Sequence, residues 1–250
     1  MTTSATPSGG TAPAATWLTQ RDIDGLVFTG EMYGIQLDQL TTLLTATEER
    51  ARAVSARWRA HGYADTARLG PGKAWLWLTR MGLAACGLPY SAAPPALSRL
   101  AHIRAVTAVR LALESSGVYR TAAATWRSER RLRACTGRPG AAVHIPDGEV
   151  HWPDSADVPY AGECWAIEAE LTAKTVRRTA SIMAELLART GDYGCPATQR
   201  AVPGASPWHA RALYLCSPAA RHTVVRARGE LGAALAARIE VRDLPPGARM

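Results

Sequence analysis

Acidic side chains in the second half of the chain stand where they could hold a metal ion. Asp147 follows a proline, and Glu168 and Glu170 lie two residues apart in an apolar run, Cys164 to Leu171, that is typical of a strand. Side chains on a strand alternate between its two faces, so Glu168 and Glu170 are expected on the same face. Carboxylates at the ends of neighbouring strands can converge on one hard cation, Mg²⁺ or Mn²⁺. Such an ion lowers the pKa of a bound water and offsets the negative charge of a phosphoryl transition state.

Glu129 and Lys174 could complete this site. Glu129 lies in a helix expected over residues 121–134 and would support the metal, whereas Lys174 would orient water or stabilise the leaving phosphate. The chain contains only two lysines and uses one of them here, where an arginine would be bulkier and could not lose its proton. We therefore predict as catalytic Asp147, Glu168, Glu170 and Lys174, with Glu170 holding water or a second ion, and as metal ligands Glu129, Asp147 and Glu168.

Each of these residues also has an ordinary structural interpretation. Glu129 stands in the run Glu-Arg-Arg-Leu-Arg, which is typical of a charged helix surface. An Asp-Gly pair such as Asp147-Gly148 is common in turns. Carboxylates at strand ends are also frequent as solvated residues and caps. The set favours a metal site only when its members are taken together and in order.

Histidine, tyrosine and cysteine residues offer weaker candidates. His144 and His151 flank the Asp147 turn and could support it from outside the metal site. Tyr193 and Tyr214 could be nicking nucleophiles, but we interpret them as a packed loop residue and a core residue. The five cysteines are odd in number and widely spaced and form no CxxC pair, which favours buried free thiols in a reducing cytoplasm over a zinc site or disulfides.

The elements of the first half are those of a winged helix-turn-helix. Helices are expected over residues 18–33, 36–44 and 48–61, the last with a capping box from Thr45 to Glu48, followed by a hairpin around Gly70-Pro71-Gly72. In such a unit the third helix fits the major groove of DNA and the hairpin reaches phosphates. The predicted DNA-binding residues are Arg50, Arg52, Arg57, Arg59, Arg68 and Lys73. Alternatively the unit is a packing module, and its arginines are a solvated helix face.

The second half has the pattern of a small α/β domain. After a linker at 91–95 and a long helix at 96–115, we expect helices over 121–134, 174–190 and 217–228 and strands over 141–145, 150–152, 164–171, 211–216 and 239–244. The predicted class is therefore α+β. The expected organisation is a disordered tail at 1–16, a DNA-binding domain at 17–90, a linker and connecting helix at 91–118, and an α/β domain at 119–250.

Charge and hydropathy limit the partners of the chain. Its 29 Lys+Arg against 21 Asp+Glu give a formal charge of +8, which favours a polyanionic partner, although the arginine excess also reflects codon usage. A run of about 18 apolar residues is missing, and the N-terminus lacks the order of a signal peptide. We expect a cytoplasmic protein without a membrane partner.

Several short motifs resemble known families. Pro146-Asp147 followed by Glu168-Ala169-Glu170 resembles the core of PD-(D/E)xK nucleases, which commonly draw a further glutamate from a preceding helix, as Glu129 would supply. From about Thr19 to Leu244 the chain resembles the replication-relaxation family of actinobacterial plasmids and integrative elements. The matching motifs are Leu76-Trp-Leu-Thr-Arg-Met-Gly-Leu83, Trp126-Arg-Ser-Glu129, Ala166-Ile-Glu-Ala-Glu-Leu-Thr-Ala-Lys174 and Leu213-Tyr-Leu-Cys-Ser-Pro218 with Arg221.

The resemblance implies a winged helix joined to a PD-(D/E)xK nuclease-like domain. It departs from the nuclease pattern at Glu170, where the family has a lysine that Lys174 could replace from the following helix. The implied function is DNA binding for a mobile element, with Mg²⁺- or Mn²⁺-dependent nicking of double-stranded DNA in plasmid replication or conjugative transfer. The alternatives are a catalytically inactive DNA-binding regulator that uses the nuclease-like fold to dimerise or to recruit other replication or transfer proteins, and an interaction module that does not contact DNA.

Overall fold

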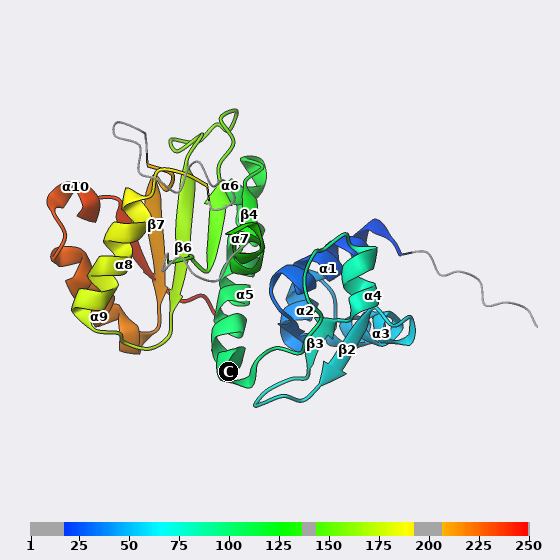
Figure 1. Cartoon of the computed structure of the whole chain (residues 1–250). Helices are drawn as coiled ribbons and strands as arrows, with labels where there is room; N and C mark the ends of the chain where they lie inside the picture. The colour runs from blue at the N-terminus through cyan, green and yellow to red at the C-terminus, as the bar shows by residue number, and fades with distance from the viewer. Residues whose placement is uncertain (1–17, 137–143, 193–206, 250) are drawn as a thin grey trace, which may run out of the picture.

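The computed structural model describes residues 18–136, 144–192 and 207–249 (Figure 1). The expected tail at 1–16 lies outside these residues. The first half contains α1 (Gln20–Glu31), β1 (Ile35–Gln36), α2 (Leu37–Leu43), α3 (Glu48–Ala60), β2 (Ala64–Ala67), β3 (Trp75–Leu78) and α4 (Arg80–Ala85). Strands β2 and β3 form the predicted antiparallel hairpin, and β1 adds a short strand that pairs with β3. The three predicted helices are confirmed.

Side-chain caps fix where these helices begin. Thr19 caps α1 in a reciprocal capping box with Asp22. The predicted cap of α3 is wrong, because Thr47 rather than Thr45 accepts from the backbone N–H of Arg50. Thr45 has a φ of 46°, a left-handed turn conformation that a helix N-cap does not take.

The second half is built on a mixed five-stranded sheet. Its elements are the 3₁₀ turn η1 (Leu97–Arg99), α5 (Leu100–Ser115), α6 (Gly117–Thr121), β4 (Thr125–Ser128), α7 (Glu129–Thr136), β5 (Gly148–His151), β6 (Cys164–Glu170), α8 (Val176–Ala188), β7 (Arg211–Cys216), α9 (Pro218–Gly229), α10 (Ala233–Ala236) and β8 (Ile239–Asp243). The strand order is β4-β5-β6-β7-β8, with antiparallel pairing from β4 to β6 and parallel pairing from β6 to β8. The predicted α+β class is confirmed.

Three predicted elements differ from the structure. The helix predicted over 121–134 is instead β4 followed by α7, because Trp126 and Ser128 alternate inward and pair with β5. His144 and Ile145 are not in a strand, and residues 141–143 lie outside the described part. The helix expected from Lys174 begins at Val176, since Thr175 caps it, so Lys174 lies in the loop after β6.

Helix α5 lies between the two halves and packs on the sheet face opposite α8 and α9 (Figure 1). One cluster of buried side chains runs without a break from Leu26 and Trp58 in the first half to Trp126 and Ile167 in the second. A second cluster fills the space under α8 and α9. The connecting helix therefore docks the halves on a shared core. Among the described residues, no helix is long and apolar enough to cross a membrane.

Gly148 is the first residue of β5 and directly follows Asp147. A Cβ at this position would lie 2.1 Å from the Trp126 ring, which is held by the core. We expect Gly148→Ala to lower the free energy of unfolding by about 2–3 kcal/mol through overpacking, measured by urea denaturation. Gly117→Ala is the control, because nothing lies within 4 Å of a Cβ there. Equal stability of the two variants would contradict this packing.

Candidate functional site

The acidic residues singled out from the sequence meet at one pocket. It has a volume of about 630 Å³ and opens to solvent between α5, α7 and the end of β6. Its lining includes Glu129, Asp147, Glu168, Glu170 and Lys174. Antiparallel pairing of β5 with β6 brings them together, because Gly148 lies opposite Ile167 and so Asp147 stands beside the end of β6. The alternation of β6 turns both Glu168 and Glu170 toward this pocket, as predicted.

Backbone hydrogen bonds hold Asp147 in place. The N–H of Ala169 donates to Asp147 Oδ2 at 2.9 Å, and the N–H of Glu129 donates to the Asp147 carbonyl at 3.1 Å. Glu129 is the first residue of α7, directly after β4, so the start of this helix is tied to the turn before β5. Three neighbouring strands therefore fix the positions of the acidic residues.

Two histidines contact the buried carboxylates. His102 on α5 binds Asp147, with 2.8 Å between Nε2 and Oδ1, and His144 binds Glu168, with 2.7 Å between Nε2 and Oε1. His144 was expected to support the site from outside it, whereas the sequence reasoning missed His102. The spacing of His102 and Arg99, one helical turn apart on the same face, could have pointed to it. In the structure Arg99 also contacts an acid of this pocket, Glu129.

The other two acids of the pocket, Glu129 and Glu170, are also paired with basic side chains. Glu129 accepts from Arg99 at 2.6 Å and from Arg133 at 2.7 Å, and the Lys174 ammonium contacts Glu170. Arg133 and Arg178 line the pocket as well and were not predicted. The rim therefore presents arginine and lysine side chains that can attract an anionic substrate.

Burial and mutual repulsion shift the pKa values of the two inner carboxyls, Asp147 and Glu168. Burial and the nearby Asp147 carboxylate raise the pKa of Glu168 to about 7. Burial acts to raise the pKa of Asp147 too, but the hydrogen bonds from His102 and the Ala169 amide outweigh it and hold that pKa below its usual value. Two carboxyls pushed apart in pKa in one pocket are a frequent mark of a functional site.

The raised pKa of Glu168 makes stability depend on pH. Between about pH 4.5 and about pH 7 the folded protein keeps a proton on Glu168 that the unfolded chain releases, so this carboxyl costs stability as the pH rises. Glu168→Gln removes that cost, and we expect it to gain about 1–3 kcal/mol relative to the unchanged protein between pH 5 and pH 8. Urea unfolding at the two pH values measures this gain. The exposed Glu240→Gln is the control, and the same pH response in both variants would contradict the assignment.

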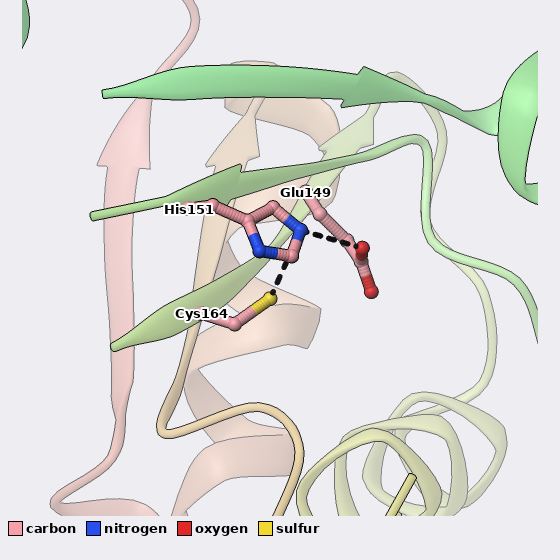
Figure 2. Close-up of side chains that lie close together, drawn as sticks. All are labelled: Glu149, His151 and Cys164. Atoms are coloured by element: carbon pink, nitrogen blue, oxygen red, sulfur yellow. Dashed lines mark hydrogen bonds and ion pairs between the residues drawn. The ribbon is translucent and has the colours of Figure 1, made fainter. Parts of the chain in front are cut away.

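A second cluster lies on β5 and β6 outside this pocket. Glu149, His151 and Cys164 each bring one possible metal-ligating atom within 4.8 Å of the other two (Figure 2). Among the described residues, this is the group of histidine, cysteine and acidic side chains that meets this spacing. Sequence reasoning missed it as a group, because only the pairing of β5 with β6 brings Cys164 to Glu149 and His151. Within the described part of the chain, the acidic pocket holds no three ligand atoms that all lie within 4.8 Å of one another.

The six predicted DNA-binding residues divide into two sets. Arg52 and Lys73 both contact Glu48, and Arg57 contacts the buried Asp22, which also accepts from the Trp58 indole. Arg57 therefore joins α3 to α1. Arg50, Arg59 and Arg68 are exposed and have no carboxylate within 4.0 Å in the described residues.

The remaining side chains that the sequence drew attention to are structural or undescribed. Tyr214 is fully buried in the core, as predicted, and Tyr193 lies outside the described residues. Of the cysteines, Cys164 and Cys216 are buried free thiols as predicted, Cys86 is half-buried, and Cys135 is exposed, which the prediction had wrong. Cys195 lies outside the described residues.

Comparisons of this chain with protein-family models, with curated proteins and with solved structures found no match.

Proposed function

We propose that this protein binds double-stranded DNA through its first half and cleaves a phosphodiester bond at the acidic pocket of its second half. One observation carries this proposal. Five residues that are up to 45 positions apart, Glu129 to Lys174, line a single open pocket with the composition of a metal-dependent phosphodiesterase.

The order of the elements supports the nuclease-like interpretation. Helices α5 and α6 are followed by the antiparallel strands β4, β5 and β6, with α7 between β4 and β5, and then by the helix α8 and the strand β7, which is parallel to β6. Pro146-Asp147 stands at the start of the middle strand and Glu168-Ala169-Glu170 ends the third. These positions place the residues of the PD-(D/E)xK-like motif at the ends of neighbouring strands, which supports the proposal. Lys174 reaches the pocket from the loop after β6, where it could replace the lysine that is missing at position 170.

The donor set of the pocket suits Mg²⁺ or Mn²⁺. Glu168 is buried and Asp147 is largely buried, their carboxylates are close enough to repel each other, and a hard cation between carboxylate oxygens relieves such repulsion. These two residues would hold the ion, with Glu129 supporting it from α7. When bound, the ion would activate water and neutralise charge that develops on the phosphate.

The other side chains have roles of their own in this proposal. His102 and His144 hold one oxygen each of Asp147 and Glu168 and so fix the orientation of the two carboxylates. Lys174, Arg133 and Arg178 face the pocket and would bind the non-bridging oxygens of the target phosphate. The paired Glu170 would hold the Lys174 ammonium at the rim until DNA arrives.

The first half fits duplex binding. Three helices followed by a hairpin agree with the order predicted for a winged helix-turn-helix, and β1, which was not predicted, adds a third strand in the sheet order β1-β3-β2. Helix α3 carries the exposed residues Arg50 and Arg59, which lie nine positions apart and so flank its buried side from opposite edges, and Arg68 follows β2 in the hairpin loop. Helix α3 would enter the major groove and the hairpin would contact phosphates.

Nicking of supercoiled plasmid tests the proposal. The purified full chain is incubated with plasmid in Mg²⁺, in Mn²⁺ and in EDTA, and open circles are measured on a gel. We expect open circles with either ion and none in EDTA. A chain that binds duplex DNA yet leaves the plasmid intact under all three conditions would remove the nuclease half of the proposal. The resemblance to the replication-relaxation family assigns such nicking to replication or transfer of a mobile element in the cytoplasm.

One observation favours the inactive regulator as a second candidate. Each acid of the pocket is already bonded to a basic side chain, which is how a site that no longer binds metal would be stabilised. Calorimetric titration of the full chain with Mg²⁺ and Mn²⁺ distinguishes the two candidates. Metal binding that is lost in Asp147→Asn supports the nuclease. A chain that binds no metal but still binds duplex DNA supports the regulator. The regulator would use this face to dimerise or to recruit replication or transfer proteins.

A further inference from the structure

Three possible metal ligands face one another on the neighbouring strands β5 and β6 (Figure 2). His151 lies directly opposite Cys164 in the antiparallel register. Glu149 stands two residues before His151 and so projects from the same face of β5. None of the three lines the acidic pocket. The group is therefore a feature of the sheet itself, separate from the site described above.

The spacing of the three ligand atoms matches a tetrahedral ion. His151 Nε2 is 3.6 Å from Cys164 Sγ and 3.0 Å from Glu149 Oε2. Zinc binds sulfur at about 2.3 Å and nitrogen or oxygen at about 2.0–2.2 Å, so the ligand atoms of a tetrahedral site lie roughly 3.3–3.6 Å apart. The distance from Nε2 to Sγ already lies in this range, the distance from Nε2 to Oε2 is a few tenths of an ångström shorter, and all three atoms lie within 4.8 Å of one another. Sulfur, imidazole and carboxylate together are a ligand set for Zn²⁺ rather than for Mg²⁺.

A second layer of hydrogen bonds orients Glu149. Its Oε1 accepts from the Trp208 indole at 2.9 Å and contacts His209 Nε2 at 2.8 Å, and both partners are held in the fold next to β7. This leaves Oε2 directed at His151. Outer-shell bonds of this kind are what fix the carboxylate ligands of metal sites. Glu149 is fully buried, so its position is set by the protein and not by solvent.

Arg127 is the cation that an incoming metal ion would meet. Its Nη1 is 3.3 Å from Glu149 Oε2 but 3.0 Å from Asp192 Oδ1, so it keeps a carboxylate partner when Glu149 turns to a metal. The carboxylates of Glu149 and Asp192 and the thiolate of Cys164 would balance the charge of the ion and of Arg127. The side chain of His151 is 28% exposed, which gives the ion a path and water a fourth position.

The same geometry argues against a catalytic cysteine. A Cys-His-Glu triad needs the acid and the thiol on different ring nitrogens, whereas here Glu149 and Cys164 both approach Nε2. Burial also raises the pKa of the Cys164 thiol, which disfavours a free thiolate nucleophile. Convergence on one nitrogen is the arrangement expected of ligands that share an ion.

We propose that Glu149, His151 and Cys164 bind one divalent transition-metal ion of the Zn²⁺ class, with water in the fourth position. On binding, the Cys164 thiol releases its proton to solvent and the sulfur ligates as thiolate. The ion would tie β5 to β6 and so stabilise the sheet that carries the acidic pocket. A search for CxxC pairs does not find this site, because it contains one cysteine and strand pairing brings that cysteine to the other two ligands.

Metal loading of the full chain tests the site. After dialysis against Zn²⁺ and then metal-free buffer, we expect about one bound zinc per chain. Replacement by Co²⁺ should give a thiolate-to-cobalt absorption band, and Cys164→Ser should abolish it. Cys135→Ser, which removes an exposed thiol, is the matched control and should keep the band. Asp147→Asn should also keep it, which separates this site from the acidic pocket.

His151→Ala is the second variant, because a partly exposed side chain can be removed without a closed cavity in the core. We expect it to lower zinc affinity at least about 10-fold and to abolish the rise in melting temperature that Zn²⁺ gives the unchanged protein. Substoichiometric zinc in the unchanged protein would overturn the proposal. So would a cobalt–thiolate band that survives in Cys164→Ser, or zinc affinity that is unchanged in His151→Ala.

Discussion

Asp147→Asn is expected to lower metal-dependent nicking about 10³-fold, equivalent to about 4 kcal/mol of activation free energy, while duplex affinity stays the same. Asparagine keeps the size of the side chain, and its carbonyl oxygen can still accept from the Ala169 amide. The variant lacks the negative charge that would hold the cation. Without the cation, the attacking water is not activated and the charge that develops on the phosphate is not neutralised. The initial rate of plasmid nicking in Mg²⁺ measures the effect.

Asp243→Asn is the control for this experiment. Asp243 is an exposed carboxylate on β8 that contacts Arg221 and does not line the pocket, so its variant should nick at the unchanged rate. Glu168→Gln should behave as Asp147→Asn does, because both carboxylates are required by the same ion. Nicking that survives in both pocket variants would show that any cleavage by this protein occurs elsewhere.

Removal of the three unpaired cations, by Arg50→Ala, Arg59→Ala and Arg68→Ala together, should have the largest effect on DNA binding. Each lost phosphate contact reduces the slope of log K against log salt by about 0.9, so the slope should fall by about 2.7. At low salt the affinity should fall roughly 10²-fold or more, because electrostatic contacts supply most of non-specific binding. Fluorescence anisotropy with a labelled duplex over a range of salt concentrations measures both quantities.

A matched variant removes the same charge from the other end of the molecule. Arg226 and Arg228 lie on α9, far from α3 in Figure 1, and Arg242 lies on β8. Their replacement by alanine should leave the salt slope nearly unchanged. If both triple variants lose affinity equally, net charge rather than the cations of α3 and the hairpin governs binding, and the duplex-binding assignment is wrong.

Local sequence patterns were sufficient for most elements of the fold. The alternation in Cys164–Leu171 predicted β6 and the shared face of Glu168 and Glu170, because the period of a strand is fixed by backbone geometry. The pattern failed at Trp126, where four strand residues lie between two short helices. A stretch this short has no period of its own, and pairing with β5 decides its conformation.

The pairings inside the pocket could not be predicted from the sequence. His102 contacts Asp147 across 45 positions, and Arg99 contacts Glu129 across 30, through the docking of α5 on the sheet. Docking depends on how the apolar side chains of α5 fit both halves of the chain, and that fit depends on every neighbour at once. The same reason applies to the ligands that strand register brings together on β5 and β6.

By itself, the sequence determined the α+β class, most helix and strand positions, and the identity of the acidic residues, because these follow from local periodicity and side-chain chemistry. Only the tertiary structure decided that those acids share a pocket, that histidines bind the two inner ones, and that the halves share one core. Proximity between distant residues is a property of strand register and helix packing, which residue types alone do not specify.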